Sequence, residues 1–310
     1  MRMHRRLCLF AIAGAVAIGV LQSHACAGET SGQAKVAPFK LGEGRKLGPG
    51  PAKENSGIVK SRQWPDLFWM HNDSGDGPRI YPVRRDGSVY PSERYPDSPG
   101  VLIGGAINVD WEDITVTASG QLLVADCGNN ANDRRDLVLY YLPEPAPTAG
   151  RTTTFKKVFF RYPEQQKFPA PEDDFNYDAE AVFALGDEVY LCTKHRSDTK
   201  TRLYRLPDGG PDEVRSLELV DRFDVRGQVT GADASANGKR LVLLTYDSLW
   251  LFEITDPEAP LSGPVKWLPY EGGDDVEAVC FADADTLLVA AEGTGRLYEV
   301  PLARFTEFKR

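Results

Sequence analysis

The sequence predicts an all-β fold of the β-propeller class, because one layout recurs five times along the 310-residue chain. Each segment begins with a polar residue, carries a second polar residue two positions later and continues into a short apolar strand. A tight turn and two further strands follow in every segment, which is typical of propeller blades. After the N-terminus the sequence has almost no 3.6-residue amphipathic pattern, so we expect few helices.

The segment starts define two series of polar residues. The first series is Glu54, Asp110, Asp178, Gln228 and Asp275. The second series is Ser56, Glu112, Glu180, Thr230 and Glu277. The third strand of every segment carries an apolar–aromatic pair, such as Leu203-Tyr204. A β-sandwich also contains short strands, but it does not explain this five-fold register.

We count five blades from these repeats. A weaker fourth strand is predicted in four of them, at Val101–Ile107, Thr154–Tyr162, Leu217–Phe223 and Pro264–Leu268. The last repeat reaches the end of the chain without one, so we expect Ala37–Leu41 to supply it and to close the ring with an N-terminal strand, which leaves no exposed sheet edge. The alternative count is six, with a degenerate blade in the long interval at residues 144–170.

Residues 1–27 have the features of a secretory signal peptide. Three arginines precede the apolar run Leu7–Leu21, which is too short for a membrane-spanning helix. The triplet Ala25-Cys26-Ala27 then offers a cleavage site. We therefore expect a single propeller domain at residues 28–310, located in the periplasm or secreted, with a lipid anchor on Cys26 as the alternative.

The net charge of the chain indicates which kinds of partner the protein can bind. The formal net charge is −9, and loss of residues 1–27 removes three arginines and no acidic residue, so the mature domain carries −12. This charge argues against nucleic acid and anionic membranes and favours a metal cation or a cationic partner. No second apolar run is long enough to span a membrane, and we expect a monomer. Three cysteines remain, which permits one disulfide and a free thiol, or three thiols.

The polar residues are expected to meet at one mouth of the central channel, because the start of a blade's first strand and the end of its second strand lie at the same face. Besides the glutamates of the second series, the residues expected on this rim are Glu54, Asp73, Asp110, Asp178, Lys194, Tyr246, Asp275 and Glu292. Two carboxylates about 4 Å apart repel each other by about 4 kcal/mol at an effective dielectric constant of about 20.

A bound cation would relieve that repulsion, and oxygen ligands favour Ca²⁺. We expect Ca²⁺ to be held by some of Glu112, Glu180 and Glu277 with Asp or Asn partners. The alternative is structural, with the carboxylates accepting hydrogen bonds from backbone amides of the neighbouring blade.

His71 and His195 are the candidate general acid and base, because histidine titrates near neutral pH. Each lies 15 residues after the second polar residue of its segment, so we expect the two rings in equivalent places on the rim. The alternative is that both are polar loop residues without a catalytic role.

The motifs ENSGI, HNDSGD, DWEDI, DCGNN, YDAEA and VTGAD resemble those of an uncharacterised group of bacterial exported propellers, over nearly the whole mature chain. More distantly, the acidic mouth is similar to that of the gluconolactonase/SMP-30, paraoxonase and esterase-like phytase propellers, in which a central metal serves hydrolysis of lactones or phosphate esters. The resemblance implies Asp126 and Asn129 as further metal ligands beside Glu112, Glu180 and Glu277. The D-A-D-D-P-A run of the phytases is absent.

Two functions are compatible with these observations. The first is a binding module whose rim takes a small molecule, a glycan or an envelope protein, with Ca²⁺ at the mouth. The second is a metal-dependent hydrolase of esters, lactones or phosphate esters, in which the cation polarises the substrate. The sequence leaves open whether the protein is an enzyme.

Overall fold

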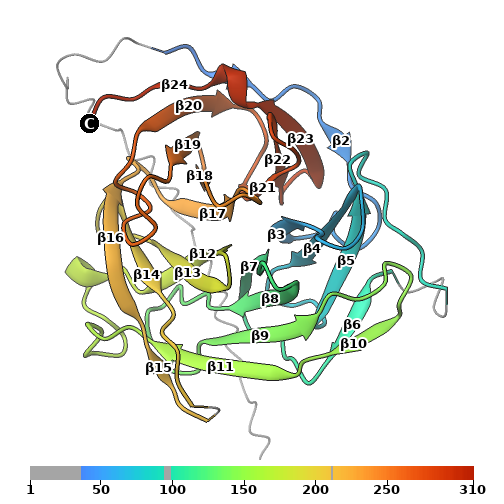
Figure 1. Ribbon diagram of the computed structural model, residues 1–310, viewed down its shortest axis with the longest axis horizontal. Helices are drawn as coiled ribbons and strands as arrows, with labels where there is room; N and C mark the ends of the chain where they lie inside the picture. The colour runs from blue at the N-terminus through green and yellow to red at the C-terminus, as the bar shows by residue number, and fades with distance from the viewer. Residues whose placement is uncertain (1–35, 94–98, 211) are drawn as a thin grey trace, which may run out of the picture. The chain divides into compact units, whose positions relative to one another are not determined.

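The computed structural model describes residues 36–93, 99–210 and 212–310. In this part of the chain five β-sheets surround a central axis, and each sheet is one blade (Figure 1). The predicted all-β propeller with five blades is therefore confirmed. The interval at residues 144–170 holds no sixth blade, because its two strands, β10 (Arg151–Thr153) and β11 (Lys156–Arg161), are outer strands of the first and second blades.

The strands of each blade follow one another from the axis outwards. Blade 1 contains β3 (Asn55–Lys60), β4 (Leu67–Asn72), β5 (Arg79–Arg84), β6 (Val101–Gly104) and β10. Blade 2 contains β7 (Trp111–Val116), β8 (Gln121–Asp126), β9 (Val138–Pro143), β11 and β15 (Arg215–Ser216). Blade 3 contains β12 (Asp178–Leu185), β13 (Glu188–Lys194), β14 (Lys200–Arg205) and β16 (Glu218–Asp224).

Blade 4 contains β17 (Val229–Ala234), β18 (Arg240–Thr245), β19 (Ser248–Glu253) and β20 (Val265–Glu271), with β1 (Phe39–Lys40) and β24 (Thr306–Glu307) paired to β20. Blade 5 contains β21 (Val276–Phe281), β22 (Thr286–Ala291), β23 (Arg296–Pro301) and β2 (Arg45–Lys46). Two 3-10 turns, η1 (Glu172–Asp174) and η2 (Leu302–Arg304), are the only helical elements among the described residues, and no helix there is long and apolar enough to cross a membrane.

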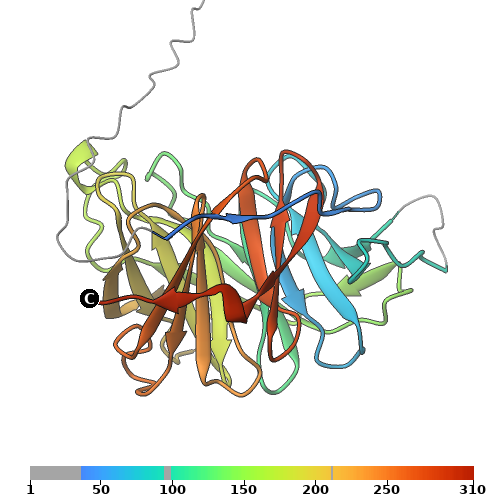
Figure 2. The same ribbon diagram turned by 90° about the horizontal axis from the view of Figure 1, so that it is seen from above.

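The ring is closed by the N-terminal segment, but not with the register that the sequence suggested. The outer strand of blade 5 is β2, and the predicted stretch Ala37–Leu41 instead supplies β1, which pairs in parallel with β20 of blade 4. Gly42 and Gly44 between them have positive φ angles of 75° and 61°, so the chain turns there and passes from one blade to the next. Figure 2 shows this blue segment and the dark red C-terminal segment crossing the same two blades.

The apolar core is divided into five clusters, and each lies between two neighbouring blades. Leu123 of blade 2 and Leu191 of blade 3 belong to one cluster, and Ile58 of blade 1 and Cys280 of blade 5 belong to another. Full burial of one such large apolar side chain contributes about 1.5–3 kcal/mol. The inner strands β3, β7, β12, β17 and β21 are therefore packed on both sides, which makes their ends a rigid frame around the axis (Figure 1).

Two buried aspartates tie neighbouring inner strands together. Asp113 Oδ2 accepts a hydrogen bond from the Val182 amide at 2.9 Å, which joins β7 to β12. Asp233 Oδ2 accepts one from the Phe281 amide at 2.8 Å, which joins β17 to β21. Of the mouth carboxylates, Asp178 has the same structural role, because its Oδ1 accepts from the Asn129 amide of blade 2 at 2.6 Å.

The described cysteines, Cys127, Cys192 and Cys280, are buried free thiols, so the possible disulfide is not formed among them. The predicted signal peptide and Cys26 lie outside the described residues.

Candidate functional site

A β-bulge at the start of every inner strand aims one side chain towards the channel mouth. In each blade the pairing of the first and second strands skips one residue of the first strand. The skipped residues are the second polar series, Ser56, Glu112, Glu180, Thr230 and Glu277. A bulge redirects the side chain that it carries. The repeat seen in the sequence is thus a repeated backbone irregularity that brings five polar side chains to one place.

The ends of the second strands lie opposite the first polar series, as expected. Asp178 pairs with Lys194, the Asp73 amide donates to the Glu54 carbonyl at 2.8 Å, and the Glu292 amide donates to the Asp275 carbonyl at 2.8 Å. Tyr246 follows the second-strand residue Thr245, which pairs with Val229. Asp73, Lys194, Tyr246 and Glu292 therefore share the mouth with the glutamates of the bulges.

Two groups of three carboxylates form at this mouth. Asp73, Asp110 and Glu112 make the first group, and Glu112, Asp178 and Glu180 make the second. Within each group one oxygen of every residue lies within 4.8 Å of the others. Glu112, Asp178 and Glu180 are buried, and Asp73 and Asp110 are half-buried. Glu112 belongs to both groups and so connects the bulges of blades 2 and 3.

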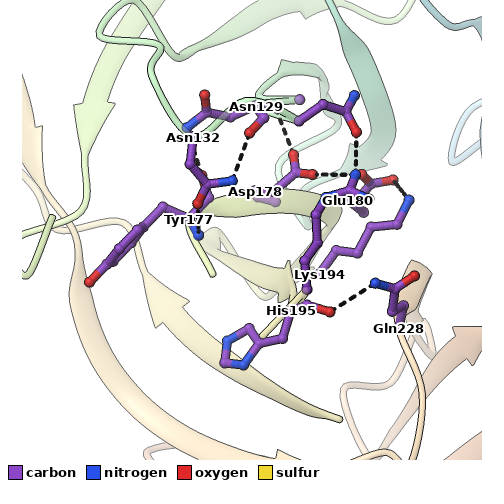
Figure 3. A network of polar contacts seen from close by, with 12 residues as sticks. Asn129, Asn132, Tyr177, Asp178, Glu180, Lys194, His195 and Gln228 are labelled. Atoms are coloured by element: carbon purple, nitrogen blue, oxygen red, sulfur yellow. Dashed lines mark hydrogen bonds and ion pairs between the residues drawn. The ribbon is translucent and has the colours of Figure 1, made fainter. Parts of the chain in front are cut away.

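Basic side chains neutralise the second group but not the first. Lys194 Nζ lies 3.1 Å from Glu180 Oε2 (Figure 3). Arg196 Nη2 lies 2.9 Å from Asp178 Oδ2. Lys194 also donates to the Tyr246 hydroxyl at 2.9 Å, and that hydroxyl donates to Glu277 Oε1 at 3.0 Å.

By contrast, none of Asp73, Asp110 and Glu112 forms an ion pair with a described residue. The negative charge of the mouth is therefore least compensated at the first group.

The acidic groups hold their protons more tightly than isolated carboxyls. Burial, followed by the charge of Asp73, raises the pKa of Asp110 to about 6. Burial, followed by the charges of Glu180 and Asp178, raises the pKa of Glu112 well above its usual range. Burial and the neighbouring Glu277 raise the pKa of Glu292 to about 8. A divalent cation held by Asp73, Asp110 and Glu112 would reverse the shifts of Asp110 and Glu112, because it stabilises the ionised form.

Gly128 leaves room for the first group, and the sequence did not single it out. A Cβ at residue 128 would overlap Glu112 Oε1 and Asp110 Oδ2. The absence of a side chain in the DCGNN segment thus allows two carboxylates to approach the backbone there. The signal in the sequence was a glycine two residues after the end of a second strand, close to acidic residues.

The side chains of Asp126 and Asn129 form hydrogen bonds that hold the loop containing Gly128 in place. Asp126 accepts from the amides of Val109 and Asp110, each at 3.2 Å, and from Arg134 Nη2 at 2.8 Å. The Asn129 side chain donates to the Tyr177 carbonyl at 2.8 Å (Figure 3) and accepts from two loop amides at 2.9 Å. These two residues support the site rather than face it, and Arg134, which the sequence did not point to, supports it with them.

His71 and His195 do not occupy equivalent positions. His71 pairs with Gly57, whereas the corresponding pair in blade 3 is Cys192 with Ala181. The hairpin between β3 and β4 is longer than that between β12 and β13, so equal spacing in sequence does not give equal places in the blades. This corrects the expected equivalence of the two histidines.

Neither imidazole is placed on an exposed rim. His71 is buried and packs edge-on against Trp111 at 5.7 Å, and burial lowers its pKa to about 4. The ring of His195 is turned away from Glu180 and bonds Asp198 at 2.7 Å through Nδ1, while its backbone carbonyl accepts from Gln228 (Figure 3). The two candidate residues thus lie apart. His71 is packed between blades 1 and 2, and His195 holds the loop that contains Asp198.

No protein-family model and no curated protein matches the sequence. Among solved structures, the PQQ-bound aldose sugar dehydrogenase of Streptomyces coelicolor is 12% identical, with 84% of this chain and 83% of that chain covered and a TM-score of 0.45. Hydrazine synthase of Kuenenia stuttgartiensis is 8% identical, with coverages of 81% and 72% and a TM-score of 0.43. A functionally unknown protein from Desulfotomaculum acetoxidans is 10% identical, with coverages of 81% and 70% and a TM-score of 0.42. At these identities and TM-scores we take no function from them.

Proposed function

We propose that this protein is an exported binding module that holds Ca²⁺ at the acidic mouth of its propeller channel and uses the ion to bind an oxygen-rich ligand. One observation carries the proposal: buried Glu112 lies in two carboxylate groups, and the group with Asp73 and Asp110 has no basic partner among the described residues. The donor set contains carboxylate oxygens alone, which suits Ca²⁺ or Mg²⁺ better than softer metals.

Asp73, Asp110 and Glu112 would hold the ion from two blades, and Gly128 leaves the space for it. Ca²⁺ takes six to eight oxygen ligands, so three carboxylates leave positions for the oxygens of a small molecule, a glycan or an envelope protein. The neighbouring loop adds an apolar border, because Ile107 and Val109 are 65% and 46% exposed. A weak site of this kind suits an extracytoplasmic protein, where Ca²⁺ concentrations are high, and the signal peptide predicted at residues 1–27 supports that location.

Thermal unfolding tests the ion site directly. We expect added Ca²⁺ to raise the unfolding temperature of EDTA-treated protein, because an ion that binds only the folded state stabilises it by about 2.7 kcal/mol at a concentration 100 times its Kd. Glu112→Gln should abolish the shift. The matched control is Glu253→Gln, which neutralises an exposed glutamate at the end of β19. A wild-type unfolding temperature that responds neither to EDTA nor to Ca²⁺ would refute the proposal.

Hydrolysis is the second candidate function, and the state of Glu292 favours it. With a pKa of about 8, this carboxyl keeps its proton at neutral pH at the same mouth as the proposed ion, so it could act as a general acid. A screen of model esters, lactones and phosphate esters with Ca²⁺ should then show turnover that Glu292→Gln removes. Turnover that instead depends on His71 or His195 would contradict this assignment.

A further inference from the structure

The far end of the channel holds a cavity whose chemical character differs from that of the acidic mouth. The inner strands run from the acidic mouth to this end, where β3 finishes at Lys60, β17 at Ala234 and β21 at Phe281. The cavity has a volume of about 250 Å³. Its apolar lining includes Val59, Val116, Ala234 and Phe281. This volume is slightly below the usual range of about 300–1,000 Å³ for small-molecule sites, which suits a ligand with a single ring.

Positive charge prevails in this cavity, although the protein as a whole is acidic. Three basic residues line it, Lys60, Arg62 and Arg240, against two acidic ones, Asp233 and Asp283. Of these two acidic residues, Asp283 forms an ion pair with Arg85, whose Nη1 lies 2.8 Å from Asp283 Oδ2. Asp233 is buried and accepts the Phe281 amide, and burial raises its pKa to about 7, so much of it is uncharged near neutral pH.

The basic residues differ in how far they are engaged. Lys60 Nζ donates to the Ala282 carbonyl, and the Arg240 guanidinium lies 5.3 Å from the centroid of the Phe281 ring. The guanidinium of Arg62 makes neither a hydrogen bond nor an ion pair with any described residue. Arg62 is exposed, and its charge partly offsets the effect of burial on the pKa of Asp233. An arginine whose N–H donors form no hydrogen bond with the protein, beside an apolar cavity, matches a carboxylate or phosphate group carried on an apolar body.

We infer that this cavity binds a small organic anion, with its carboxylate or phosphate on Arg62 and its apolar part against Val59, Ala234 and Phe281. The site is separate from the proposed ion site, because the two lie at opposite ends of the same inner strands. Anion binding in this cavity can therefore be tested independently of Ca²⁺ binding.

Calorimetric titration of the EDTA-treated protein with phenylacetate tests the inference. We expect phenylacetate to bind at least about tenfold more tightly than phenylacetamide, which has the same shape without the charge, because a hydrogen bond to a charged group is stronger than one between neutral groups. Phenethylamine and acetate should bind more weakly still, since the first has the wrong charge and the second lacks the ring. Equal binding of phenylacetate and phenylacetamide, or no binding of phenylacetate up to about 10 mM, overturns the inference.

Two variants locate the binding. Arg62→Ala should weaken phenylacetate by about tenfold, whereas Arg222→Ala, which removes the same charge from an exposed position on β16, should leave it unchanged. Ala234→Leu should weaken binding by filling the cavity while keeping every charge. Unfolding temperatures of all three variants verify that the ring is intact, and phenylacetate binding that survives both Arg62→Ala and Ala234→Leu overturns the assignment to this cavity.

Discussion

The bulge position differs between blades 1 and 4 and the other three blades, although its backbone is the same in all five. In blades 1 and 4 a hydroxyl bridges to the next inner strand, because Ser56 donates to the Glu112 carbonyl and Thr230 to the Val276 carbonyl, each at 3.0 Å. In blades 2, 3 and 5 a glutamate occupies the position and makes no such bond. The comparison indicates that the fold needs the bulge but not the hydroxyl. The bulges of blades 2, 3 and 5 can therefore carry glutamates, although charge at these positions lowers the stability of the fold.

Blades 2, 3 and 5, which carry a glutamate at the bulge, are called the charged blades here, and blades 1 and 4 the uncharged blades. The largest effect should come from removing the charge of Lys194, which pairs with Glu180 of blade 3. Lys194→Met leaves buried Glu180 without its partner, and we expect the free energy of unfolding in urea to fall by about 3–5 kcal/mol. The double variant with Glu180→Gln should recover most of this loss. Lys239→Met, at an exposed lysine, is the control. A loss of no more than that of the control would show that the glutamates need no compensation.

Filling the space beside Glu112 should come next. Gly128→Ala places a methyl group against Glu112 and Asp110, and overpacking of this kind costs about 1–3 kcal/mol. Because the two carboxylates must move apart, we also expect a weaker Ca²⁺-induced rise in unfolding temperature. Gly77→Ala is the matched control, since a Cβ there meets no atom within 4 Å. An unchanged calcium response in Gly128→Ala would place the ion elsewhere.

Stability should also depend on pH in a direction set by the charged blades. The carboxyls of Asp110 and Glu292 have folded-state pKa values of about 6 and about 8, above the value of about 4 expected in the unfolded chain. The folded state thus binds more protons at these carboxyls, and in EDTA the unfolding temperature should fall by roughly a few degrees as the pH rises from 7 to 9, above the range in which His71 and His195 titrate. Saturating Ca²⁺ should flatten this decline. A rise over the same range would contradict the raised pKa values.

The smallest effect is expected in the uncharged blades. Thr230→Val removes the hydroxyl that joins blade 4 to blade 5, and we expect a loss of about 1 kcal/mol in the free energy of unfolding. The calcium response should be that of the wild type, because no carboxylate is touched. A changed response would mean that the two kinds of blade are not independent.

Much of the fold followed from the repeat itself. The fourth strands lay where the pattern placed them, so that Leu217–Phe223 became β16 and Pro264–Leu268 became β20, because alternating apolar residues and turns act locally. The ring closure was less predictable. The two-residue strands β1 and β2 contain too few residues to show a pattern, and their partners lie near the other end of the chain.

The site was predicted in its acidic residues but not in its details. The bulge residues Glu112, Glu180 and Glu277 recur in the sequence, so a common direction could be inferred for them. Arg134 and Arg196 come from loops outside the repeat, and nothing in their spacing shows that they bind Asp126 and Asp178. The expected equivalence of His71 and His195 was wrong because it used spacing across hairpins of different length, where pairing register decides the position.

Ring closure by β1 and β2 has a consequence for how the chain folds. Residues 39–46 must wait for strands at residues 265–301, so a segment that emerges early during synthesis finds its partners late. Contacts so distant along the chain form slowly. Until those C-terminal strands arrive, β1 and β2 stay unpaired and the ring stays open, which is the interval when a passing chain or a chaperone could pair with the exposed strand edges.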